Sequence, residues 1–421
     1  MLRTIALIAG VVLLTVTSAQ TVSAQVFGIE LHNTTMPASG GMAGTSLSQP
    51  QDVTSAINGN PATTTLFPGT QFIFGGAFVE PTYNVNQTAA LPLIGVTPFS
   101  GKSATPASLL GNIGVTHQTE VMGIPLTLGM GFISNAGLGV DFRQFPESNG
   151  THASYLALDV VNSVGIQVSP QLSFGTSIAI GTSILDGPFA SSSSSQIAYS
   201  PRFSVGSNYD FGNGRSIGVY WQSKKWLTFD NIVRFPGGSF QDIDLEHPSN
   251  FGIGIANQSL MCGRLLLAAD FLFKNYSDAD FFKAIYENQW VFQFGSQYQI
   301  NEKLKFRMGY YFNEDPTRDA VPGTIGGIVP VGGIPSVQYV QGQFASVTQH
   351  SLSGGFGVRE LLPGMDFDLS LGGAFQGEKS FGDTTASVES YWIAFGFTYR
   401  RGATTPYTSE VSNFSMPADG Q

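Results

Sequence analysis

The sequence predicts an all-β protein: a transmembrane antiparallel β-barrel of about 14 strands with an N-terminal plug inside its lumen. Three observations carry this prediction. Apolar and small or polar residues alternate with a period of two from Gln71 to Arg400, and the connections alternate between short and long. The segment before Gln71 is rich in small residues and has no apolar period. A closed barrel suits lipid because it leaves no unpaired strand edge.

The chain begins with the features of a secretory signal peptide, which we assign to residues 1–24. Residues 1–3 supply a positive start, Ile5–Val16 is an apolar run, and a small-residue cleavage site ends at Ala24. An alternative cut follows Ala19. The apolar run is too short for a spanning helix. We therefore expect an exported protein whose barrel lies in the cell outer membrane.

Composition limits the possible functions. The chain has 51 Gly and 33 Phe, only 11% charged residues and a formal net charge of −10, which argues against nucleic acid as a partner. The single cysteine, Cys262, excludes an intramolecular disulfide, and His152, His247 and His350 lack metal-ligand spacing. No nucleophile–base arrangement or phosphate-binding loop is found. We expect a protein that is not an enzyme and uses no cofactor.

The alternation is clearest near the C-terminus. In Glu389–Arg400 one face carries large apolar and aromatic side chains from Tyr391 to Tyr399, and the other carries small ones such as Ala394 and Gly396. Aromatic residues at both ends of a strand suit the two membrane interfaces. A water-soluble sandwich could also alternate, but its polar face would be charged and its apolar face less aromatic. The pattern therefore favours the membrane barrel.

Segments of this kind number about fourteen, an even total that places both ends of the sheet on one side. The first strand is expected to turn Phe72, Phe74 and Phe78 outward. The predicted strands are Thr70–Glu80, Gly111–Thr119, Ile124–Asn135, His152–Val168, Gln171–Leu185, Ile197–Asp210, Arg215–Asp230, Ser249–Asn257, Arg264–Asn275, Gln289–Ile300, Lys303–Asn313, Thr348–Arg359, Met365–Gln376 and Glu389–Arg400.

The connections predict an orientation. Bacterial barrels keep short turns, such as Ser169-Pro170 here, in the periplasm and long loops outside. The N-terminal segment therefore starts on the periplasmic side. Two long loops contain unusually apolar stretches, Ala89–Phe99 and Val321–Val340, which suggests contact with something hydrophobic. The barrel is assigned to residues 70–400, and residues 401–421 form a polar tail.

Residues 25–69 are too few and too polar to fold alone, but inside a barrel they would have walls to pack against. We interpret them as a hatch that plugs the lumen. At their centre lies Asn60-Pro61-Ala62. Asn-Pro commonly begins a turn, and a turn is compatible with gating, because proline fixes φ and needs no partner for an N–H group.

The hatch and parts of the barrel resemble the FadL/TodX family of outer-membrane transporters for long-chain fatty acids and other hydrophobic compounds. The Asn-Pro-Ala motif is the most specific part, and the resemblance spans nearly the whole mature chain. The chain departs from the family in its polar C-terminal tail, and in Ile184 and Leu185, which stand where the family places a basic residue for the ligand carboxylate. The stretches that carry the resemblance are Gly40–Ser46, Asp52–Ala62, Leu66–Gly69, Gly129–Phe142 and Phe306–Pro316.

This resemblance implies passive uptake. The apolar extracellular loops would capture the ligand, the hatch would move at Asn60, Pro61 and Ala62, and the ligand would leave sideways at a kinked third strand. The kink is expected at Ser134, Asn135, Gly137 and Gly139, since glycine permits a bulge without a side-chain clash. An equally weighted alternative is that these glycines only relieve crowding.

Four basic residues fall on the lumen face by parity and are candidate contacts for a ligand carboxylate: Arg202, Lys224, Lys274 and Arg307. The alternative, which we weigh more heavily, is ion pairing inside the lumen. The acidic residues available for such pairing are Asp159, Asp210, Asp270, Asp366 and Asp368.

The leading hypothesis is an outer-membrane transporter for passive uptake of long-chain fatty acids or other hydrophobic compounds. Its partners would be hydrophobic small molecules and membrane lipid, and we expect a monomer. Two alternatives are a plugged structural or adhesive barrel and a general porin. The porin predicts an open, water-filled lumen, and the adhesive barrel predicts a plug without a lateral opening. A hydrophobic route from the loops to a gap near residues 134–139 would favour transport.

Overall fold

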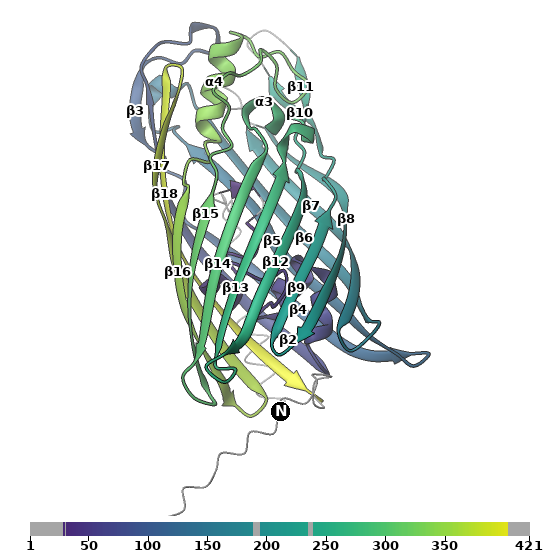
Figure 1. Cartoon of the computed structure of the whole chain (residues 1–421). Helices are drawn as coiled ribbons and strands as arrows, with labels where there is room; N and C mark the ends of the chain where they lie inside the picture. The colour runs from purple at the N-terminus through teal and green to yellow at the C-terminus, as the bar shows by residue number, and fades with distance from the viewer. Residues whose placement is uncertain (1–27, 30, 188–193, 235–238, 403–421) are drawn as a thin grey trace, which may run out of the picture.

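The chain folds into a closed antiparallel β-barrel in the computed structural model, which describes residues 28–29, 31–187, 194–234 and 239–402 (Figure 1). The main sheet has 16 strands, and two of them, β1 (Gly28–Ile29) and β3 (Phe99–Lys102), are short additions to a barrel of fourteen. The predicted fold class is confirmed. The predicted signal peptide, 1–24, and residues 403–421 of the tail lie outside the described residues.

Neighbouring strands of the wall follow one another in chain order, and β18 pairs with β2 from Thr384↔Gln87 to Arg401↔Thr70 to close the barrel. The strands of the wall are β2 (Thr70–Gln87), β4 (Ser108–Val121), β5 (Ile124–Asp141), β6 (His152–Gln167), β7 (Leu172–Gly187), β8 (Ser194–Gly212), β9 (Arg215–Gln222), β12 (Ser249–Leu260), β13 (Leu265–Asn275), β14 (Gln289–Gln299), β15 (Leu304–Asn313), β16 (His350–Leu362), β17 (Met365–Phe381) and β18 (Thr384–Arg401).

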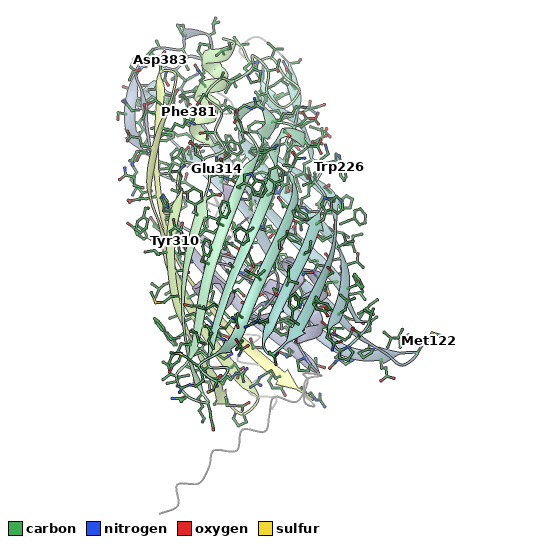
Figure 2. All side chains as sticks on the ribbon, viewed as in Figure 1. Met122, Trp226, Tyr310, Glu314, Phe381 and Asp383 are labelled. Carbon is green, nitrogen blue, oxygen red and sulfur yellow. The ribbon has the colours of Figure 1, made fainter. Side chains whose placement is uncertain are left out.

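The outer face of the wall is apolar and aromatic. Phe72, Phe74 and Phe78 are each more than 40% exposed, whereas Ile73 and Ala77 between them are fully buried, so the predicted outward set of the first strand is confirmed. Side chains project from the wall along its height (Figure 2). A cylinder with an apolar exterior is what lipid as the outer solvent requires.

Short turns gather at one end of the barrel and long loops at the other. We name these the turn end and the loop end; in Figure 1 the turn end is at the bottom. Met122 lies at the tip of the β4–β5 turn, away from the wall (Figure 2). The exception is the β17–β18 connection, a tight turn at Gly382-Asp383 that lies at the loop end.

Several strands are longer than the sequence predicts. β2 continues to Gln87 and β5 to Asp141, and β17 and β18 form one tall hairpin where a loop from 377 to 388 was expected. In the opposite direction, the predicted strand Arg215–Asp230 is wrong beyond Gln222, because β9 ends there. The chain then leaves the wall and forms a separate hairpin, β10 (Thr228–Arg234) and β11 (Phe240–Asp244). Its alternating residues face other loops instead of lipid.

The hatch segment, described from residue 31 to residue 69, fills the lumen toward the turn end. It contains the short helices η1 (Ser39–Met42), α2 (Val53–Asn58) and η2 (Pro61–Leu66). Asp52 holds them together: Oδ1 accepts the Ser55 N–H at 2.8 Å as the N-cap of α2, and Oδ2 accepts the N–H groups of Ala38 and Ser39 at 3.1 and 2.9 Å. No described helix is long and apolar enough to cross a membrane.

An apolar core fills the loop end, and we name it the loop core. It is made of 40 buried apolar residues from the loops and the upper parts of the strands, and it includes Tyr286, Phe282 and Phe344. Burial raises the pKa of the Tyr286 hydroxyl well above its ordinary range, and this hydroxyl donates to the Phe344 carbonyl. The loop elements are η3 (Pro92–Ile94), η4 (Pro146–Ser148), β10, β11, η5 (Tyr276–Asp278), α3 (Phe282–Ile285) and α4 (Ile334–Gln343).

Candidate functional site

The Asn60-Pro61-Ala62 motif begins η2 and presses against the barrel wall. Asn60 caps this helix, because its Oδ1 accepts the Ala62 N–H at 3.1 Å. Its Nδ2 donates to the carbonyl of Leu47 at 2.8 Å and to that of Ser207 on β8 at 2.9 Å. Pro61 stands at the start of the helix, where a missing N–H leaves no bond unmade. The expected turn is therefore present, and one buried amide ties it to the wall.

Three glycines of the wall leave room for the hatch: Gly175 on β7, Gly206 on β8 and Gly218 on β9. A side chain on any of them would overlap the hatch, because each hypothetical Cβ falls far inside van der Waals contact. No pattern in the sequence singles these positions out among 51 glycines. The distances are 2.3 Å from Gly175 to Ala62 N, 2.1 Å from Gly206 to Asn60 Oδ1 and 2.0 Å from Gly218 to Leu47 O.

An acidic residue of the wall also holds the hatch. Asp270 on β13 is 1% exposed, and its Oδ2 accepts the N–H groups of Ser46 and Leu47 at 2.7 and 3.0 Å. Hydrogen bonds to a charged acceptor are about twice as strong as neutral ones. The sequence places Asp270 among possible ion-pair partners, but the structure uses it as an anchor for the hatch backbone.

The wall is interrupted between β4 and β5, the second and third strands of the barrel. Their ladder ends at Asn112↔Ile133, although β5 continues to Asp141 and stays paired with β6 on its other side. The next contact along the chain is a side-chain bond, from Ser134 Oγ to the Gly111 carbonyl at 3.3 Å. Toward the loop end, the Ala104 N–H donates to the Asp141 carbonyl at 2.8 Å. The interruption therefore has a lower and an upper limit, and we name it the wall opening.

A β-bulge bends β5 at the wall opening. Ser134 pairs with Leu158 and Ala136 pairs with the next residue, Ala157, so Asn135 is an extra residue. Every residue from 133 to 138 is buried, where a regular wall strand alternates between buried and exposed. Ser134 and Asn135 lie at the bulge, and Gly137 and Gly139 lie in the strand that follows. These are the residues at which the sequence predicts a kink, and their role as a lateral opening stays a prediction.

The first described residues of the predicted hatch, 28–29, do not lie with the rest of it in the lumen but occupy the wall opening. In β1, Gly28 pairs with Gly137 and Ile29 pairs with Ala136, on the edge of β5 that β4 has left. The Leu31 N–H continues this contact by donating to the Asn135 carbonyl at 3.2 Å. Nothing in the composition of these residues signals the pairing, because backbone groups make it.

Neighbouring groups of the protein bind the candidate cations Arg202, Lys224 and Arg307. The Arg202 guanidinium donates to the carbonyls of Ser223 and Pro248 at 2.7 and 2.8 Å. Lys224 lies beyond the end of β9, so its predicted place on a lumen-facing strand is wrong, and it pairs with Glu246 at 3.0 Å. Arg307 pairs with Asp368 at 2.7 Å and donates to Gln297 at 2.8 Å. Ion pairing with one of the predicted aspartates accounts for Arg307, whereas the Lys224 partner, Glu246, is not among the acidic residues predicted for such pairing.

Lys274 lines a cavity of about 70 Å³ between the hatch and the wall. The indole Nε1 of Trp392, which lines the same cavity, is buried and has no hydrogen-bond acceptor among the described residues. Leu31 and Ala43 contribute the hatch side. A larger cavity of about 470 Å³ lies below the hatch at the turn end, and Arg307 and Asp368 are among its lining residues.

Comparison with known proteins gives structural matches only. No protein-family model matches the chain, and no curated protein does. The toluene transporter TodX of P. putida matches with a TM-score of 0.62 and 15% identity over 87% of this chain and 98% of that one. The chain has the FadL/TodX fold.

Two further solved structures share this fold. A FadL homologue of Pseudomonas aeruginosa matches with a TM-score of 0.67 and 14% identity over 88% of this chain and 99% of that one. The toluene transporter TbuX of Ralstonia pickettii matches with a TM-score of 0.58 and 17% identity over 86% and 98%. At these identities the likeness concerns the fold, and the FadL/TodX resemblance expected from the sequence is confirmed at that level.

Proposed function

We propose that this protein carries hydrophobic compounds passively across the outer membrane and releases them sideways into the lipid through the wall opening. Proteins with the same fold include two named as toluene transporters and one, CymD, named as a monoaromatic hydrocarbon channel. The turn end would face the periplasm and the loop end the outside, as in other bacterial barrels.

One observation carries the proposal: the wall opening lies against the loop core. Ala136, Leu138 and Val140 of β5, just beyond the bulge, belong to the same apolar cluster as the loops. A hydrophobic compound that enters this core from outside therefore reaches the β5 edge of the opening without crossing the polar hatch, and it would leave by displacing β1, which pairs along that edge. Apolar surface of this kind lowers the free energy of an apolar solute relative to water.

Capture would begin on the two apolar loops. Most of their large side chains are buried in the loop core, but Leu93, Val329 and Ile334 remain 61%, 68% and 50% exposed. The loops meet here, because a Cβ on Gly332 would lie 4.0 Å from Leu93 Cβ. Exposed apolar residues gathered on a loop end suit a first contact with a hydrophobic compound.

The hatch would act as the water barrier. Asn60, Pro61 and Ala62 are held at three glycines of the wall, so the lumen is filled at this height. The large cavity below the hatch is lined by charged and amide side chains such as Lys305, Arg359 and Gln297, which suit water better than an apolar compound. The arrangement supports exit above the hatch, at the wall opening, over passage through it.

The bound compound would be mostly uncharged. Lys274 is the candidate contact for an acidic group, because it lines the cavity between the hatch and the wall. The cavity at Lys274 has a volume of about two water molecules, so it can hold the head group of a ligand but not its hydrocarbon chain. Hydrocarbons fit the route as a whole, and a fatty acid would place its carboxylate at Lys274.

Two other functions fit the molecule less well. A general porin needs an open lumen, but the hatch and the loop core fill it. A plugged adhesive barrel has no need for a wall opening bounded by a bulge, where two strands lose their ladder. Both alternatives leave the position of the opening beside the loop core without a role.

Deletion of Asn135 tests the proposal. Without the extra residue the β5–β6 ladder becomes continuous, so β5 can straighten and the opening narrows. We expect uptake of radiolabelled toluene to fall at least about tenfold, while the barrel still resists SDS at room temperature.

The matched control is deletion of Gln376. It sits in the bulge of β17, between the pairs Ala374↔Ser390 and Gly377↔Val388, and two strands, β18 and β2, separate β17 from β4 at the opening. This variant should keep its uptake. Normal uptake without Asn135 in a folded barrel would exclude the lateral route.

A further inference from the structure

We propose that Asp159 is a latch that couples the β10–β11 hairpin to the wall opening. Lys225 from the base of the hairpin binds one of its carboxylate oxygens, and Asn135 from the bulge binds the other. The inference rests on the proposed lateral route and adds how a ligand in the loop core would release it.

The hairpin is tied to the inside of the wall at its base. Lys225 and His247 exchange both backbone hydrogen bonds at 3.2 Å, which closes the loop that begins after β9. The His247 ring contacts the hydroxyl of Tyr155 on β6, and that hydroxyl donates to Ser183 on β7 at 3.1 Å. The base therefore has two fixed points on the wall, His247 and Lys225.

Asp159 joins this base to the opening. Lys225 Nζ lies 2.5 Å from Oδ1, and Asn135 Nδ2 donates to Oδ2 at 2.6 Å. The side chains of Lys225 and Asp159 are 0% and 1% exposed. Asp159 itself lies opposite Ile133, the last β5 residue that pairs with β4. The carboxylate thus sits where the wall opening begins and binds both the extra residue and the loop.

Burial makes the two contacts dependent on each other. A carboxylate out of water needs a cation close by, and removal of one partner from a buried pair leaves an uncompensated charge. If Lys225 moves away, Asp159 must draw in water or turn toward it, and its bond to Asn135 weakens. A hydrogen bond to a charged acceptor is strong only while that charge stays in place.

The hairpin lies where a ligand would enter. Leu227, Phe229 and Ile243 are fully buried in the loop core together with Leu138 of β5, and the rings of Phe229 and Tyr155 are 6.4 Å apart. A compound that occupies this core must displace apolar side chains of the hairpin, because the core is packed. Displacement of the hairpin moves Lys225, and the bulge is then free to change shape.

Thiol labelling at the opening tests the latch. The exposed Cys262 is replaced in Cys262→Ser, and Ala136→Cys, next to the bulge and fully buried, serves as the reporter for a lipid-soluble maleimide in liposomes. In this parent protein we expect toluene to increase the labelling rate about tenfold. An effect of this size corresponds to the loss of one charge-assisted hydrogen bond.

Asp159→Asn/Lys225→Met removes the latch without leaving an unpaired charge, so the result does not depend on whether Lys225→Met alone folds. Labelling without toluene should rise about tenfold, and toluene should then add less than about twofold. The matched control is Arg307→Met/Asp368→Asn, a buried pair below the hatch, which should label like the parent. Labelling of the double variant that equals the parent's, with and without toluene, would overturn the latch.

Toluene uptake by cells that carry the same variants separates the two proposals. Uptake that does not depend on Asn135 overturns the lateral route itself. Uptake that depends on Asn135, with unchanged labelling in Asp159→Asn/Lys225→Met, overturns the latch alone.

Discussion

The hatch and the loop core both block the lumen, but they are held by different forces. The hatch is fixed by backbone groups: Asp52 and Asp270 accept N–H groups, Asn60 binds two carbonyls, and wall glycines admit the chain at close range. The loop core is held by apolar side chains in contact with one another. Directional bonds specify one geometry, whereas apolar packing tolerates several. The loop core is therefore suited to admit an apolar guest, whereas movement of the hatch at Asn60, Pro61 and Ala62 stays a prediction.

The largest expected effect comes from a methyl group under the hatch. Gly175→Ala places a Cβ 2.3 Å from the Ala62 nitrogen, and backbone on both sides leaves little freedom to relax. We expect the hatch to be displaced at a cost of about 1–3 kcal/mol in unfolding free energy. Single channels in planar bilayers should then conduct ions.

Gly111→Ala is the control for this substitution, because its Cβ would meet nothing within 4 Å. It should leave conductance at the background of the unchanged protein. An ion-tight barrel with Gly175→Ala would show that the hatch adjusts more easily than its glycine contacts suggest.

The smallest expected effect is in the loop core. Phe282 is fully buried and lies 5.4 Å from Tyr286, ring to ring, and Phe282→Leu keeps an apolar side chain there while removing three carbon atoms. The free energy of unfolding should fall by less than about 1.5 kcal/mol, without any rise in ion conductance. Thermal unfolding followed by circular dichroism, with conductance in parallel, measures both. A loss of stability as large as that of Gly175→Ala would mean that the loop core is as rigid as the hatch.

The sequence predicts the wall well because its signal is repeated. Alternation along each strand places Phe72, Phe74 and Phe78 toward lipid, and the same rule holds for strand after strand, so a single misplaced boundary changes little. The boundaries fail where the strands leave the lipid. Above that level β17 and β18 pair with each other and with the loops, and apolar alternation no longer marks them.

The site is only partly predictable. Gly137 and Gly139 give a local signal for a kink, but the extra residue is Asn135, and only the register of β5 against β6 reveals it. The burial of Lys225 has no local signal at all, since a lysine after a strand is usually exposed. Its partner Asp159 lies 66 positions away in the sequence. Contacts of this range come from the closure of the barrel.

The most direct test of lateral release is to crosslink an apolar compound to the residues that it contacts during transport. Cells that carry the protein are irradiated with a diazirine-bearing analogue of toluene, and the labelled peptides are mapped by mass spectrometry. Lateral release predicts labels in the loop core and along residues 134–140 of β5, and fewer labels when Asn135 is deleted. Labels confined to the hatch and to the cavity below it would contradict lateral release.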